Sequence, residues 1–131
     1  MKSKKIVFSL PFILASIAIF IASHQDGAPF DDSLFAFQDK VLHFSAYFIY
    51  GVTIQLYLLR YRLYKHKYII YTILIGSLFG ISDEIHQYFI PNRSTDVFDW
   101  IADTMGVTAS LSISVYLKKI FNFISNKYNL K

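Results

Sequence analysis

Four long apolar segments alternate with short polar segments along the chain. The apolar segments cover residues 6–22, 44–59, 68–82 and 104–117, and the third resumes as 85–90 after an acidic break. A membrane-spanning helix needs about 20 mostly apolar residues, so each of the last three must extend through the polar residues beside it. We therefore predict transmembrane helices over about residues 6–22, 39–59, 68–90 and 97–117.

Composition supports a membrane protein over a soluble one. The 131 residues are 54% hydrophobic and only 17% charged, whereas soluble domains average about 25% charged residues. This excludes a soluble enzyme and a disordered chain, and predicts a single all-α transmembrane domain over residues 1–131. The chain has no cysteine, which excludes disulfides and thiolate metal sites.

The distribution of charge predicts how the helices are oriented. Of the 13 basic residues, three precede the first apolar segment, four lie in 60–67 and four follow residue 117. None of the nine acidic residues lies in these segments. With four spans, all three basic segments are on one side, which the positive-inside rule makes the cytoplasm. We expect a multi-pass cell-membrane protein with both termini cytoplasmic and no nucleic-acid partner.

The first 38 residues carry two further expectations. Residues 1–23 also have the basic start and apolar stretch of a signal peptide. However, Ile21 precedes Ala22 and Ser23 where a cleavage site needs small residues, so an uncleaved first helix is expected. The segment 24–38 mixes polar and apolar residues and is predicted to lie along the membrane surface.

Three of the predicted helices become polar at a similar depth. At about 1.5 Å per residue, their apolar parts extend roughly 21 to 24 Å from the cytoplasmic boundary, short of the about 30 Å hydrocarbon core. Ionisable groups within a span usually face the protein interior or a wet cavity. The alternative is that these polar residues lie at helix ends among the lipid head groups. This alternative suits Asp39, Lys40 and Asp99 better than the remaining polar residues of the three helices. We predict an outward-facing polar cluster of Asp39, Lys40, His43, Tyr47, Asp83, Glu84, Gln87, Arg93, Asp99 and Asp103, with Lys40 and Arg93 nearest any anionic ligand.

Small residues at helical spacing mark expected helix contacts. They are Gly76, Gly80, Gly106 and Ser110. Such residues let membrane helices approach closely, either within one chain or between copies, so an oligomer is possible.

Three motifs make the resemblance to a known family specific. Residues 39–47 read DKVLHFSAY, residues 83–93 read DEIHQYFIPNR, and residues 99–106 read DWIADTMG. Together, over about residues 39–115, they resemble the VanZ-like family of small helical membrane proteins. Asn92 and Ser110 stand where that family usually has glycine, and both replacements suit the same roles, a left-handed turn and a close contact. The resemblance implies a bacterial cell-envelope protein connected with susceptibility to teicoplanin, a lipid-tailed glycopeptide.

Several functions stay open at this point. The cluster could bind a lipid head group or an amphiphilic antibiotic in the bilayer, or could form an ion-pair network that locks the bundle. It could serve a membrane enzyme acting on a lipid-linked substrate, with a carboxylate as general base. A proton- or ion-coupled carrier ranks last, because the polar residues are expected to stop at one depth. Asp39, His43, Glu84 and Asp103 offer metal ligands, yet no paired-histidine spacing occurs, so no metal or other cofactor is predicted.

Overall fold

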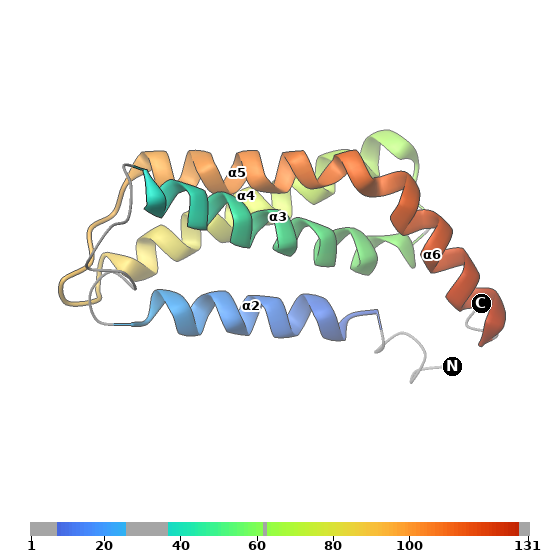
Figure 1. Ribbon diagram of the computed structural model, residues 1–131, viewed down its shortest axis with the longest axis horizontal. Helices are drawn as coiled ribbons and strands as arrows, with labels where there is room; N and C mark the ends of the chain where they lie inside the picture. The colour runs from blue at the N-terminus through green and yellow to red at the C-terminus, as the bar shows by residue number, and fades with distance from the viewer. Residues whose placement is uncertain (1–7, 26–36, 62, 129–131) are drawn as a thin grey trace.

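The computed structural model describes residues 8–25, 37–61 and 63–128, which form helices packed side by side (Figure 1). The elements are α2 (Leu10–Ser23), α3 (Gln38–Leu59), α4 (Lys65–Gln87), α5 (Val97–Ser110), the 3-10 turn η1 (Leu111–Ile113) and α6 (Ser114–Lys127). No strand occurs in these residues, so the predicted all-helical fold is confirmed for them. Most of the segment predicted to lie along the membrane surface, 24–38, falls outside the described residues.

Three helices differ from their predicted bounds for local reasons. The first predicted helix, 6–22, is α2 and begins at Leu10, with Pro11 in its first turn, where proline is favoured. The third predicted helix, 68–90, is α4 and ends at Gln87, because a residue before proline avoids helical geometry and Pro91 follows Ile90. The fourth, 97–117, is divided by η1 into α5 and α6. Ser110 Oγ donates to the carbonyl of Val107 at 2.6 Å, a side-chain bond that bends helices.

The contact between α3 and α5 depends on small residues. Gly106 lies against the backbone of Phe44 and Phe48, where a Cβ atom would overlap the carbonyl oxygen of Phe44. One turn further along α5, Ser110 lies against Gly51 in the same way. These positions bring the two backbones together, as small residues do between membrane helices.

Aromatic side chains fill the interior and hold α2 against α3. The buried core cluster consists of Tyr47, Tyr50, Ile54, Leu58, Tyr68 and Val107. From α2, Phe12 stacks on Tyr50 with ring centroids 5.7 Å apart. Ser16 and Tyr50 share a hydrogen bond of 3.1 Å.

The outer surface of the bundle is apolar. Both α3 and α4 are long and apolar enough to cross a membrane, and α2 is a shorter apolar helix. Only 39% and 33% of the apolar windows of α3 and α4 are buried inside the molecule, unlike the core helix of a soluble protein. Large exposed side chains include Leu14, Ile17, Ile49, Leu74, Leu78 and Met105. This surface suits lipid rather than water.

The acidic motifs lie together at one end of the bundle. In Figure 1 the start of α2 and the end of α6 lie at one end, together with the α3–α4 turn. The start of α3, the end of α4 and the start of α5 lie at the other, and they carry the acidic motifs.

Candidate functional site

Lys40 joins three carboxylates at the acidic end of the bundle. Its ammonium lies 2.6 Å from Asp96 and 2.6 Å from Asp99, and 3.3 Å from Asp39. Asp99 is buried, and this contact supplies its counter-charge. Lys40 therefore pairs with acids of the protein itself, and it is not among the residues that line the pocket described below.

We call Lys40 and its three acids, Asp39, Asp96 and Asp99, the ion-pair group. The loop before α5 links this group to α4. Asp96 caps α5 by accepting a hydrogen bond of 2.9 Å from the backbone N–H of Phe98. The backbone N–H of Asp96 donates to Glu84 Oε2, also at 2.9 Å. Hydrogen bonds from Lys40 and from Phe98 lower the pKa of Asp96 below its usual range. Asp96 lies outside the predicted cluster, although an aspartate directly before an apolar helix is a recognisable cap signal.

A histidine and two acids meet where α3, α4 and α5 converge. His43 Nδ1 and Asp103 Oδ1 are 2.9 Å apart. Glu84 approaches from α4, so that one ligand atom from each of the three residues lies within 4.8 Å of the others. We call His43, Glu84 and Asp103 the three-helix group. Gly80 leaves room for it, because a Cβ atom there would lie 3.0 Å from Asp103 Oδ2.

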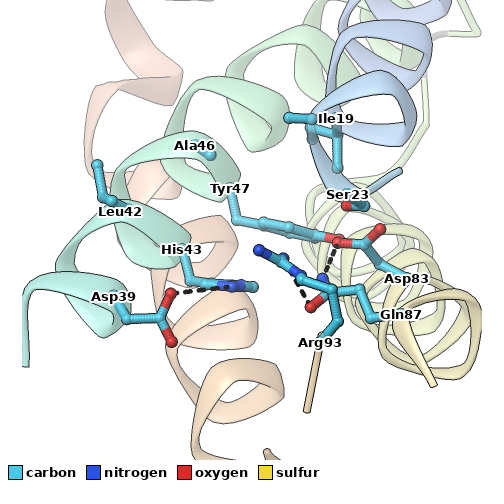
Figure 2. A pocket seen from close by; sticks show the side chains of 11 residues that line it. Ile19, Ser23, Asp39, Leu42, His43, Ala46, Tyr47, Asp83, Gln87 and Arg93 are labelled. Atoms are coloured by element: carbon cyan, nitrogen blue, oxygen red, sulfur yellow. Dashed lines mark hydrogen bonds and ion pairs between the residues drawn. The ribbon is translucent and has the colours of Figure 1, made fainter. Parts of the chain in front are cut away.

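A pocket of about 120 Å³ opens between α2, α3 and α4 beside this group (Figure 2). Both apolar and polar side chains line the pocket. The apolar residues are Ile19, Ala22, Leu42 and Ala46, and the polar ones are Ser23, Asp39, His43, Tyr47, Asp83, Gln87 and Arg93. The pocket thus offers both kinds of surface to one ligand.

A chain of hydrogen bonds orders the polar side of the pocket. Arg93 Nη2 donates to Gln87 Oε1 at 2.8 Å, and Gln87 Nε2 donates to Asp83 Oδ2 at 3.3 Å. The hydroxyl of Tyr47 donates to the same Asp83 oxygen at 3.5 Å. Figure 2 shows Arg93 reaching across the pocket toward His43 and Tyr47. Its neighbour Asn92 has φ of 59°, the left-handed turn geometry that glycine usually supplies.

The structure places all ten residues of the predicted cluster at this end of the bundle, in the ion-pair group, the three-helix group or the pocket. The four predicted packing residues lie at helix contacts: Gly76 and Gly80 of α4 face α5, and Gly106 and Ser110 of α5 face α3.

A second set of buried polar groups lies deeper, contrary to the expectation that they stop at one depth. Gln55 is fully buried and donates to the carbonyl and the hydroxyl of Ser110, both at 2.9 Å. The hydroxyl of Tyr68 donates to Gln55 Oε1 at 3.2 Å. The sequence signal that could have predicted this buried polar group is Gln55 itself, an isolated glutamine within the apolar segment 44–59.

His86 has a partner that its position in the motif did not indicate. One of its ring nitrogens lies 3.2 Å from a ring nitrogen of His24 at the end of α2, and Phe20 stacks on its ring. This exposed pair connects the end of α2 to the end of α4.

Helices with apolar outer faces and a buried polar site near one end are typical of a helical membrane protein. The model of the VanZ/LLP1 family matches residues 3–121, and the chain belongs to that family. The family assignment predicted from the three motifs is thereby confirmed. No curated protein matches the chain, and no solved structure does.

Proposed function

We propose that this protein is a cell-envelope membrane protein with four spans and both termini in the cytoplasm. Its pocket faces outward and binds the anionic head group of a lipid or another amphiphile, which lowers susceptibility to lipid-tailed glycopeptides. The observation that carries the proposal is the pocket lined by apolar side chains on one side and by Arg93 and its partners on the other.

The chemistry of the pocket supports an amphiphilic ligand. A guanidinium binds phosphate or carboxylate through paired hydrogen bonds, and Arg93 is held at the pocket by Gln87. Ile19 and Leu42 provide an apolar surface for the first part of a tail. At about 120 Å³, the pocket is smaller than the about 300–1,000 Å³ of drug-sized sites, so a head group suits it better than a whole antibiotic.

The separation of charge supports the orientation. Figure 1 places the end of α3, the start of α4 and α6 opposite the acidic end. The described basic residues of these elements include Arg60, Lys65, Lys118 and Lys127. Positive charge gathers on the cytoplasmic side of membrane proteins, so the pocket belongs to the outer half.

The first test measures antibiotic susceptibility. Cells lacking the protein are complemented with wild type, Arg93→Gln or Arg60→Gln, at matched abundance in the membrane. Arg60 is the matched control because it lies at the opposite end, over the ring of Tyr57. We expect wild type and Arg60→Gln to raise teicoplanin resistance and Arg93→Gln to leave it low. Equal resistance with all three would exclude the pocket, and no effect of wild type would exclude the glycopeptide role.

A binding measurement tests the ligand class directly. Purified protein is offered phosphatidylglycerol or phosphatidylcholine, and retained lipid is counted by native mass spectrometry. Loss of a charge-assisted hydrogen bond costs about 1.5–3 kcal/mol, so Arg93→Gln should weaken retention of the anionic lipid about tenfold or more. Equal retention of both lipids by wild type would contradict selection of an anionic head group.

A further inference from the structure

We infer that His43, Glu84 and Asp103 form a binding site for a divalent metal ion of the Zn²⁺ or Mn²⁺ type. This proposal does not depend on head-group binding at Arg93, although His43 also lines the pocket that contains Arg93. The argument rests on ligand geometry, on buried oxygens that lack partners, and on the charge around the group.

The three ligands lie close enough for small side-chain rotations to bring them onto one ion. One ligand atom from each residue lies within 4.8 Å of the others, and His43 Nδ1 lies 2.9 Å from Asp103 Oδ1. Two ligands bound to one ion at about 2.0–2.1 Å are separated by about 3.0–3.4 Å. The ligands come from three different helices, so an ion there would link α3, α4 and α5.

Two buried carboxylate oxygens independently support a cation site. Glu84 is 9% exposed and Asp103 is 0% exposed. Among the residues that the structure describes, Glu84 Oε1 and Asp103 Oδ2 have no hydrogen-bond partner. Leaving a buried carboxylate oxygen unpaired is unfavourable by several kcal/mol in order of magnitude, whereas a cation satisfies such atoms.

The balance of charge favours a doubly charged cation. In the described part of the chain, Glu84 forms no salt bridge and Asp103 has only His43. A protonated His43 would supply one positive charge for two carboxylates. With the imidazole neutral and bound to metal, a divalent ion balances both acids.

A neighbouring set of ligands is already neutralised. Asp39, His43 and Asp99 also lie close enough to share an ion. However, the ammonium of Lys40 lies 2.6 Å from Asp99 and would repel a cation. The three-helix group has no such neighbour among the ion pairs of the described residues, which selects it over this alternative.

The donors also indicate which ion is preferred. Imidazole favours Zn²⁺ and related transition metals, and carboxylates also accept Mn²⁺, whereas Mg²⁺ prefers oxygen ligands. The backbone N–H of Asp96 holds Glu84 Oε2 at 2.9 Å and leaves Oε1 for the ion. Such supporting hydrogen bonds orient the ligands of metal sites.

The test uses the full chain purified in detergent, stripped with a chelator that is then removed. Zn²⁺ alone and Mn²⁺ alone are titrated by calorimetry, and bound metal is counted by elemental mass spectrometry. We expect a single ion per chain. Glu84→Gln and Asp103→Asn each remove one charged ligand at constant size and should weaken binding about tenfold or more. The bound metal should also raise Tm in wild type and not in these variants.

Two control variants make the result specific. Asp99→Asn removes an acid of the neighbouring set, and His86→Ala disrupts the exposed histidine pair. Both should keep the wild-type affinity, as should Arg93→Gln, which separates this test from that of head-group binding. Far-UV circular dichroism and elution volume identify folded variants, and either of the two ligand variants suffices. Absence of binding by wild type, unchanged affinity in a folded ligand variant, or loss of binding only in His86→Ala would overturn the site.

Discussion

Lys40 shows how one side chain can hold the acidic end of a membrane bundle together. Its ammonium contacts Asp99 of α5, Asp96 of the preceding loop and Asp39 of its own helix. Without it, Asp99 would be a buried charge with no cation at salt-bridge distance among the described residues. Breaking such a pair by removing one partner is strongly destabilising. We therefore assign Lys40 a structural role.

Acid should weaken the contact between Lys40 and Asp96. The folded chain lowers the pKa of Asp96 through hydrogen bonds from Lys40 and Phe98. A carboxyl group with a lowered folded pKa stabilises the fold above its unfolded pKa, and this stabilisation is lost as the pH falls through the folded value. We expect Tm in detergent to fall below about pH 4, and less steeply in Asp96→Asn. Parallel Tm curves for the two proteins would contradict this contribution.

Spacing along the sequence predicted which residues share a helix face, but it could not pair them across helices. Asp39 and His43 are four apart, and so are Asp83 and Gln87, and each pair lies together. Whether Lys40 or Arg93 would pair with Asp99 depends on the rotation and height of α3 against α5. The sequence does not contain that information, so it could not show that Lys40 pairs with Asp99.

At the scale of the helices, glycines set how closely neighbouring helices approach each other. Gly106 brings α5 against the backbone of α3, and Gly76 brings α4 against Val107 of α5. The contact of Gly106 is with backbone atoms, which cannot move aside as a flexible side chain can. The approach of α3 and α5 in turn places His43 within hydrogen-bond distance of Asp103.

A methyl group at Gly106 should destabilise the bundle. On an isolated helix, alanine is more favourable than glycine by about 1 kcal/mol. Here the added Cβ would overlap the carbonyl of Phe44, and overpacking costs about 1–3 kcal/mol. We expect Gly106→Ala to lower Tm, measured in detergent against Met105→Ala, an exposed neighbour on α5. A Tm at or above that of wild type would show that α3 can shift to accept the methyl group.

Hydropathy located the helices but not the break in the last one. The segment 97–117 has the composition of one continuous helix, yet η1 separates α5 from α6. At this break, the hydroxyl of Ser110 donates to the carbonyl of Val107, and Gln55 of α3 donates to the carbonyl and the hydroxyl of Ser110. A side-chain bond of this kind changes no hydrophobic pattern, so the pattern could not predict it.

At the scale of the whole molecule, the charge at each end predicts the side of the membrane on which it lies. The natural chain has no cysteine, so single cysteines can report exposure without background. We expect Thr95→Cys, in the loop between α4 and α5, to react with an impermeant maleimide in intact cells. Asn126→Cys, near the end of α6, should react only after the cells are permeabilised. Reversed labelling would place the pocket in the cytoplasmic half.

The order of the helices along the chain has a consequence for biosynthesis. A charged residue within a spanning helix opposes insertion, by at most about 2.5–3.5 kcal/mol when it lies at the centre. α5 carries Asp99 and Asp103, and their partners Lys40 and His43 lie on α3, which is synthesised first. A nascent α5 therefore leaves the ribosome when both partners have already been made. If the two helices were exchanged in the gene, the acids would enter the membrane before Lys40 and His43 had been made.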